Sequence, residues 1–231
     1  MQTDGNWIET VRDCGYGLIP GVFDSAQVTN LIAQLDHANM PRSRAGVRHA
    51  MKNPSVARIA ADPRMMCVAK AILGDGAIPF RATLFEKLPD SNWLVAWHQD
   101  TALPLSERGE RDGWGPWSTK DGVIYAHPPA RALEPVVALR LHLDNSTSQN
   151  GPPRVLPGTH THSVLTDAEI HSFSESVTPI DCLMPLGGVI AMRPLVIHAS
   201  SKSAADVPRR VLHIEYAASR TPADGMCLAI A

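Results

Sequence analysis

The chain has 231 residues, 44% of them hydrophobic and 19% charged, with a formal net charge of −2. This size and composition suit a globular domain with a sizeable core, and the near-neutral charge gives no reason to expect nucleic acid or a membrane surface as a partner. No apolar run reaches the roughly 18–20 residues that span a bilayer, and the four scattered cysteines, without a C-x-x-C pair, argue against a zinc site or a disulfide framework.

The first third of the chain carries helical patterns after a short strand and turn over 17–23. Asp24 can cap a helix over 26–38, whose apolar residues recur at helical spacing. A second apolar stretch, 54–73, contains Asp62–Pro63, and proline disrupts a helix interior. We therefore expect two helices here, the second of them capped by the aspartate.

From residue 78 onward the pattern changes to short strands separated by turns rich in glycine and proline. The expected strands are 78–87, 93–100, 136–144, 154–156, 176–179, 188–193, 195–199 and 211–216. Helices followed by many short strands predict an α+β chain, mainly β, with a jelly-roll (cupin-like) core and flanking N-terminal helices. No repeat or boundary is visible, so we expect a single domain over 1–231.

The segment 101–135 does not fit this strand pattern. It directly follows the expected strand 93–100 and carries two of the five tryptophans, Trp114 and Trp117. Long segments of this kind in compact domains are usually functional or disordered. Two interpretations stay open, a solvated and partly mobile surface loop or a lid over an active site, and the tryptophans favour the lid.

Two short elements one hundred residues apart carry the candidate chemistry. His98 and Asp100 lie two residues apart on an expected strand, so their side chains share one face. His198 supplies a second imidazole, and Arg209 follows it at a spacing that can return along a neighbouring strand. Two histidines and a carboxylate, with open positions opposite, form the ligand set of mononuclear non-haem Fe(II) oxygenases. A guanidinium nearby suits a dicarboxylate co-substrate, because it can pair with a carboxylate through two hydrogen bonds.

An H-x-D triplet alone is a weak signal, and its simplest explanation is a contact between a histidine and an aspartate on a surface strand. The order and spacing of three motifs add specificity. WHQD (97–100), NGPPRVLPGTH (150–160) and HASSKSAADVPRR (198–210) resemble the phytanoyl-CoA dioxygenase family, a branch of the Fe(II)/2-oxoglutarate oxygenases. The similarity covers residues 10–218. It implies a double-stranded β-helix with helices packed on one sheet, and Fe(II), 2-oxoglutarate and O2 as cofactors.

By this resemblance, the family's iron ligands correspond to His98, Asp100 and His198. Arg209 corresponds to the arginine that binds the distal carboxylate of 2-oxoglutarate, and Ser200 to a residue that assists it. The chain departs from the family at 201–203, where an asparagine is common. Arg210 points away from Arg209 on a strand, so only one of them can enter the pocket, and the spacing favours Arg209. Related halogenases have a small residue in place of Asp100, so hydroxylation or a related oxidation is favoured.

Other residues are candidates from their place on the expected strands. Arg81, Thr83, Phe85 and Lys87 share one face of 78–87, and we take Arg81 and Thr83 as co-substrate contacts, whereas Lys87 can equally be a solvated strand end. Arg140 shares a face with His142 inside the expected barrel, where a charge is costly unless it is paired. The candidate substrate contacts are Trp97, Gln99, Trp114, Trp117 and Arg140.

The leading hypothesis is an oxygenase that hydroxylates a small organic metabolite and releases succinate and CO2. The alternatives are a non-catalytic jelly-roll binding protein and a cupin-type metalloenzyme that does not use 2-oxoglutarate. The arginines are dispersed in the sequence, which favours a free metabolite over an acyl-CoA. We expect no nucleic-acid or membrane partner and a monomer or small homo-oligomer. Residues 1–6 lack the basic and apolar segments of a secretory signal, which favours a cytoplasmic location.

Overall fold

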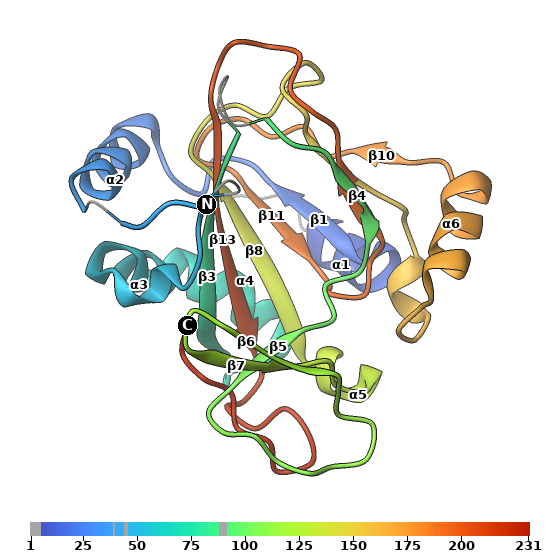
Figure 1. Ribbon diagram of the computed structural model, residues 1–231. Coiled ribbons are helices and arrows are strands. Elements are labelled where there is room, and N and C mark those ends of the chain that lie inside the picture. The colour runs from blue at the N-terminus through green and yellow to red at the C-terminus, as the bar shows by residue number, and fades with distance from the viewer. Residues whose placement is uncertain (1–5, 39, 44–45, 88–91) are drawn as a thin grey trace.

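A six-stranded antiparallel sheet forms the centre of the protein, in the strand order β1-β11-β8-β13-β3-β2 (Figure 1). Its strands are β1 (Tyr16–Ile19), β2 (Gly46–Val47), β3 (Ile78–Lys87), β8 (Val136–His142), β11 (Val189–Met192) and β13 (Arg209–Ala217). The computed structural model describes residues 6–38, 40–43, 46–87 and 92–231, so most of the N-terminal segment considered for a secretory signal lies outside it. Within the described ranges, no helix has both the length and the apolar character needed to cross a membrane.

The two faces of this sheet differ in character because successive side chains of a strand point to opposite sides. One face presents Leu84, Leu139 and Leu212 to a large apolar cluster shared with the helices. These helices are α1 (Asn6–Cys14), α2 (Ser25–His37), α3 (Pro54–Ala60) and α4 (Pro63–Leu73), with a 3-10 turn η1 (Ala50–Lys52). In Figure 1, α2 and α3 stand to the left of the sheet. The opposite face is left free to carry polar groups.

Helices α2, α3 and α4 begin within a residue of where the sequence pattern predicts, whereas α1 was not predicted. The Asp24 side chain accepts a hydrogen bond from the Gln27 backbone N–H, and the Gln27 side chain accepts one from the Asp24 backbone N–H, which completes a capping box at α2. The break at Asp62–Pro63 is confirmed: α3 ends at Ala60, and the Asp62 carboxylate caps α4. The expected strand and turn over 17–23 correspond to β1 and the residues after it.

A second, four-stranded antiparallel sheet in the order β10-β9-β12-β4 stands to the right in Figure 1. It contains β4 (Val95–His98), β9 (Pro153–Val155), β10 (Ile180–Asp181) and β12 (His198–Ser200), flanked by the 3-10 turn η2 (Thr159–Thr161) and α6 (Asp167–Ser176). Two predictions here were wrong. The expected strand over 176–179 begins at the last residue of α6, and the strand expected over 195–199 begins only at His198.

Residues 101–135 fold into a small sheet and a helical turn rather than a loop. The elements are β5 (Leu103–Leu105), β6 (Trp117–Lys120), β7 (Val123–Ala126) and α5 (Ala130–Leu133), with the strand order β5-β7-β6. Leu103, Trp114 and Leu133 belong to one buried cluster that holds this sheet. The prediction of a solvated, partly mobile surface loop is therefore wrong for these elements.

The helix-facing side of the central sheet should dominate stability. Leu139 is fully buried in the largest cluster, so Leu139→Ala should lower the free energy of unfolding by about 2–5 kcal/mol. Leu94 is 61% exposed, and Leu94→Ala should change it by less than about 0.5 kcal/mol. Urea denaturation measures both. Equal effects of the two substitutions would contradict this placement of the core.

Candidate functional site

Three potential metal-ligating side chains meet where β4 and β12 pair. His98 ends β4, Asp100 follows two residues later, and His198 begins β12 directly opposite His98. Their ligand atoms all lie within 4.8 Å of one another, and no other such group of histidine, cysteine and acidic side chains occurs in the described ranges. The pairing of β4 with β12 is irregular just beyond this point, as is frequent beside active sites.

The hydrogen bonds of both imidazoles leave the same ring nitrogen facing the carboxylate. His98 Nδ1 lies 2.8 Å from the Ala96 carbonyl oxygen, and His198 Nδ1 lies 3.0 Å from that of Val196. Nδ1 donates in each bond, so Nε2 carries the free lone pair. These Nε2 atoms lie 3.7 and 3.5 Å from the oxygens of Asp100. Such outer hydrogen bonds are the usual way that proteins orient metal-binding histidines.

The electrostatics favour the protonation states that bind a metal. Burial lowers the pKa of His198 to about 4, against the raising effect of Asp100. Burial opposes ionisation of Asp100, but the neighbouring His198 and His98 outweigh it and hold its pKa well below the usual range. A neutral imidazole and an ionised carboxylate are therefore available at neutral pH, as metal ligation requires.

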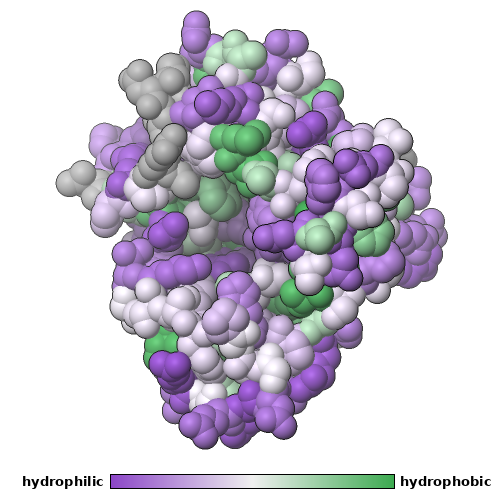
Figure 2. Space-filling view, turned by 45° about the vertical axis from the view of Figure 1, so that its right-hand side comes forward, coloured by the Kyte–Doolittle hydropathy of each residue, from purple (hydrophilic) through white to green (hydrophobic). Residues whose placement is uncertain are grey.

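A cavity of about 330 Å³ separates the six-stranded sheet from this triad. Its floor is built from alternate residues of β3 and β13, which pair as Lys87 with Arg209, Thr83 with His213, and Arg81 with Glu215. The floor spans seven residues, from Arg209 to Glu215, or about 20 Å along β13. Figure 2 shows a hollow near the middle of one face of the molecule, rimmed largely by hydrophilic residues.

One end of the cavity concentrates positive charge around Arg209. The Arg209 guanidinium donates to the Asn150 carbonyl oxygen at 3.1 Å and to Ser200 Oγ at 3.3 Å, while its buried Nη1 has no hydrogen-bond partner among the described residues. Lys87 Nζ also donates to Ser200 Oγ, at 2.7 Å. Burial and the charge of Arg140 lower the pKa of Arg209 to about 9. This end of the cavity therefore lacks a negative charge.

Gly151 allows the NGPP turn to pass close to the Ser201 backbone and to Lys87. Its φ of +66° is a left-handed conformation that side chains rarely adopt. A Cβ at this position would collide with the Ser201 backbone oxygen and press on Lys87 Nζ. The glycine of the NGPP turn thus closes the loop over the Arg209 end.

The opposite end is held by an ion pair and by a contact between distant segments. Arg81 forms a two-point ion pair with Glu215 and donates to the Ala102 carbonyl oxygen at 3.0 Å. Tyr125 of β7 hydrogen-bonds to His49 Nε2 at 2.8 Å, with both side chains buried. This second bond joins the 101–135 segment to the residues just before η1.

Comparisons with known proteins agree with the motifs that line this cavity. The family model of phytanoyl-CoA dioxygenase matches residues 11–211, most of the chain. The chain belongs to the phytanoyl-CoA dioxygenase family. The resemblance of the three sequence motifs is thereby confirmed.

Individual members and solved structures extend this result. Ectoine dioxygenase of Stutzerimonas stutzeri is 24% identical over 173 residues, which is 68% of this chain and 50% of that protein, so the chain spans about half the length of this curated relative. The structure of AviO1 from Streptomyces viridochromogenes superposes with a TM-score of 0.69 at 21% identity, over 94% of this chain and 96% of that one. The epimerase SnoN from nogalamycin biosynthesis, in complex with Fe3+, alpha ketoglutarate and nogalamycin RO, gives a TM-score of 0.74 at 18% identity, over 94% and 83%. These likenesses show a shared fold.

The structure places several predicted residues at the cavity of this family member. Thr83 and Arg140 line it, and Arg140 donates to His213 Nδ1 at 3.2 Å. Arg209 lines it, whereas Arg210 pairs with Asp144 outside it, as predicted for adjacent strand residues. Lys87 is only 2% exposed, so its interpretation as a solvated strand end is wrong.

Arg81 and four candidate substrate contacts have other positions. Arg81 lines the cavity, but at the end opposite Arg209 and committed to Glu215, so the structure does not support its prediction as a co-substrate contact. The other four lie outside the cavity lining: Trp97, Gln99, Trp114 and Trp117. We therefore do not propose these four side chains as substrate contacts.

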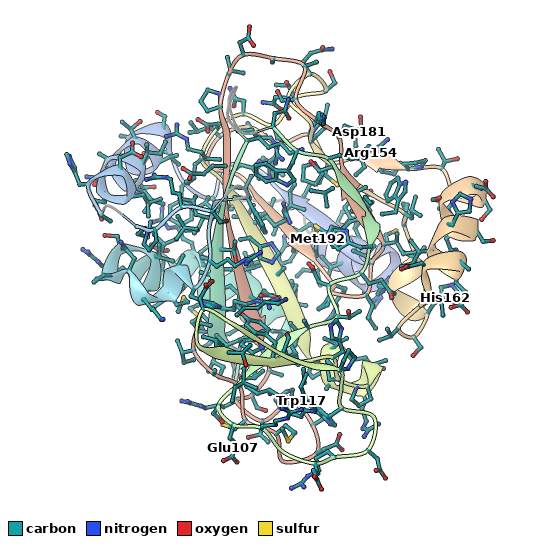
Figure 3. All side chains as sticks on the ribbon, viewed as in Figure 1. Glu107, Trp117, Arg154, His162, Asp181 and Met192 are labelled. Carbon is teal, nitrogen blue, oxygen red and sulfur yellow. The ribbon has the colours of Figure 1, made fainter. Side chains whose placement is uncertain are left out.

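Each of these four side chains has a structural environment that explains it. Gln99 bonds the backbones of Leu165 and Leu195, and Trp97 packs beside α6. Trp114 Nε1 donates to Asp224 within a buried cluster, and Trp117 packs on the same cluster. Figure 3 shows Trp117 near the lower end of the molecule, well below Met192 of β11.

Several cavity residues escaped the sequence patterns, Arg48 among them. His213 and Glu215 follow Arg209 at intervals of four and six residues on β13, so the period of the strand could have revealed them. Lys120 and Tyr125 belong to a hairpin whose Asp121-Gly122 turn has both residues at positive φ. The Asp-Gly dipeptide is a strong hairpin signal. Lys120 and Tyr125 are far in sequence from the other cavity residues, so no local pattern indicates that they reach the cavity.

The triad should bind a divalent metal more tightly than the exposed histidines of the surface do. Saturating Mn(II), a redox-stable probe, should raise the melting temperature by about 5–10 °C at a hundredfold excess over its dissociation constant. His98→Ala and His198→Ala should abolish the shift, and His171→Ala, at an exposed histidine of α6, should retain it. Differential scanning calorimetry tests this. A full shift in His198→Ala would exclude the triad as the metal site.

Proposed function

We propose that the protein is an Fe(II)- and 2-oxoglutarate-dependent oxygenase that oxidises, most simply hydroxylates, a C–H bond of a small organic metabolite. The observation that carries this proposal is the position of the His98, Asp100 and His198 cluster beside a cavity whose far end holds an uncompensated Arg209. Family membership and the structural likeness to the SnoN complex support it. Iron, 2-oxoglutarate and O2 are the cofactors it requires.

The metal would be held by His98 Nε2, His198 Nε2 and an Asp100 oxygen. The two nitrogens already face the carboxylate, and neutral imidazoles with one carboxylate match the donor set of non-haem iron sites. When bound, the iron and keto acid supply an oxidant for the C–H bond through oxidative decarboxylation to succinate and CO2. Asp100 occupies the position that a halide would need, which favours hydroxylation over halogenation.

The co-substrate would be bound by charge at the Arg209 end. Arg209 can offer its unpartnered Nη1 to a carboxylate, and a guanidinium matches that group through two parallel hydrogen bonds. Lys87 adds a second positive charge, and Ser200 fixes both cations through its hydroxyl oxygen. A dicarboxylate reaching from here toward the triad would supply the missing negative charge.

The size and polarity of the cavity favour a small substrate. A volume of about 330 Å³ is at the lower end for small-molecule sites, and the keto acid must share it. Few large apolar side chains line it, chiefly Phe85 and Trp93, so a long alkyl chain would lie among charges. A free metabolite therefore fits better than the acyl chain of an acyl-CoA.

The fold and location are part of the same proposal. We interpret the two larger facing sheets as a double-stranded β-helix, and residues 1–231 as a single domain. Residues 101–135 act as an active-site lid, because Lys120 and Tyr125 line the cavity. A cytoplasmic location remains our prediction, as does a monomer or small homo-oligomer.

Arg209 separates the oxygenase from its alternatives. Anaerobically iron-loaded protein, given O2 and a panel of small metabolites, should release succinate faster with a substrate than without one. Arg209→Ala should weaken 2-oxoglutarate binding by at least about 30-fold, because it removes a buried charged partner. Arg210→Ala, at the neighbouring arginine that pairs with Asp144, should stay within about threefold. Calorimetric titration of Mn(II)-loaded protein measures the affinities.

Two results would count against the oxygenase. A cupin-type metalloenzyme would be indifferent to Arg209→Ala. A non-catalytic binding protein would bind 2-oxoglutarate without substrate-stimulated succinate release. If the metal-loaded protein binds no 2-oxoglutarate and no metabolite stimulates turnover, the proposed function fails.

Lys87 should take up a proton when the keto acid binds. Burial, followed by the charges of Arg209 and Arg140, lowers its pKa to about 7, so at pH 8 the free protein carries mostly neutral Lys87. A nearby dianion favours the ammonium and raises this pKa. Binding at pH 8 should therefore absorb protons, and affinity should fall as the pH rises above 7. Calorimetry in buffers of different ionisation enthalpy measures the uptake. Lys87→Met should lack it, and equal uptake in both proteins would contradict the assignment.

A further inference from the structure

The cavity lining has a large excess of positive charge. It contains six cations and two acids: Arg48, Arg81, Lys87, Lys120, Arg140 and Arg209 against Asp100 and Glu215. A divalent metal would add positive charge beyond what Asp100 neutralises. Lys87, Arg140 and Arg209 are buried, and buried charges are costly unless they are paired. Arg48 and Lys120 are exposed and add positive potential at the edge of the cavity. The excess therefore indicates that the complete set of ligands is strongly anionic.

Under the proposed function, the keto acid accounts for only part of this excess. Its two negative charges would be met by the metal and by the Arg209 end, and Arg81 already has Glu215. Arg140, Arg48 and Lys120 are left. Arg140 is 8% exposed, its Nε has no hydrogen-bond partner among the described residues, and its Nη1 donates to neutral His213. The remaining two cations lie at the other end.

Arg48 and Lys120 face the same end of the cavity from two separate segments. Arg48 follows β2, and Lys120 ends β6 in the 101–135 segment. The buried bond between His49 and Tyr125 joins these two segments beside the cations. His49 takes a left-handed conformation, with φ of 53°, which costs backbone energy and is frequent at functional sites. Both cations are exposed residues at the edge of the cavity, and the buried His49–Tyr125 bond fixes the two segments that carry them.

Neither cation is neutralised within the part of the chain that is described. Neither Arg48 nor Lys120 forms an ion pair there, and Lys120 Nζ lies over the ring of Tyr125, 5.0 Å from the ring centroid. Burial and the charges of Arg81 and Arg48 lower the pKa of Lys120, so these groups are close enough to repel one another. The nearest acid in sequence, Asp121, does not line this cavity; it lines a separate surface pocket together with Arg48, and no ion pair joins the two side chains.

We propose that Arg48 and Lys120 bind an anionic group, a carboxylate or a phosphate, of the primary substrate at the end of the cavity opposite Arg209. The substrate's reacting carbon then points back toward the triad. This inference rests on the proposed function and narrows its substrate class to small organic anions. It also gives the 101–135 segment a role in substrate choice, because that segment supplies Lys120 and Tyr125.

The test uses Mn(II)-loaded protein, with the protein in excess over the metal. Saturating 2-oxoglutarate is added so that the Arg209 end is filled. The probes are inorganic phosphate and propionate, with neutral propionamide as the reference. A probe that binds in the cavity lies near the paramagnetic ion, and its 31P or 1H signals broaden. The proteins compared are the wild type, the double variant Arg48→Gln/Lys120→Gln, and Lys52→Gln, which removes a nearby exposed cation that does not line the cavity.

We expect phosphate or propionate, but not propionamide, to bind the wild type and Lys52→Gln alike. The double variant should bind that anion at least about tenfold more weakly, because two charge-assisted hydrogen bonds are lost, while its 2-oxoglutarate affinity stays unchanged. The probe that binds more tightly, phosphate or propionate, identifies the anionic group as a phosphate or a carboxylate. Failure of both probes to bind, or binding that the double variant retains, would overturn this inference alone. Absence of 2-oxoglutarate binding in the wild type would instead overturn the proposed function and this inference with it.

Discussion

The pairing of β13 with β3 and β8 is the constraint on which the rest of the structure depends. It aligns residues so that one face of the central sheet is apolar and the other carries charge. Leu212 and Ile214 then pack against the helices, while Arg209, His213 and Glu215 face the cavity. A one-residue slip would exchange these two sets. The same register therefore fixes both the core and the floor of the site.

The charged face of the sheet links stability to ligand binding. Burial and neighbouring cations lower the pKa of Arg209 to about 9 and of Lys87 to about 7, so the protein surroundings disfavour their charged forms. Their carbonyl and hydroxyl partners accept hydrogen bonds but carry no negative charge. Anionic ligands would supply that charge. Burying these unpaired cations destabilises the free protein, and ligand binding would remove that penalty. On this account the cavity is built for anions at both ends, with a metal between them.

Local patterns predicted much of the fold and the centre of the site, because helical period, strand alternation and H-x-D spacing are properties of neighbouring residues. The helix α6 and the hairpin of β6 and β7 were not predicted, although each carries a local sequence signal. Thr166 and Glu169 form a capping box at the start of α6, and Asp121-Gly122 closes the hairpin of β6 and β7. The meeting of Arg48 with Lys120 is different in kind. It depends on tertiary packing, so arginines dispersed in the sequence gather around one cavity.

A crystal structure of the protein with Fe(II) and 2-oxoglutarate, prepared without oxygen, tests the central claim most directly. The account predicts a single iron bound by His98, Asp100 and His198, with the distal carboxylate of the keto acid at Arg209. Electron density for the metal at any other group of residues would contradict it. So would a keto acid whose distal carboxylate lies at the Arg48 end.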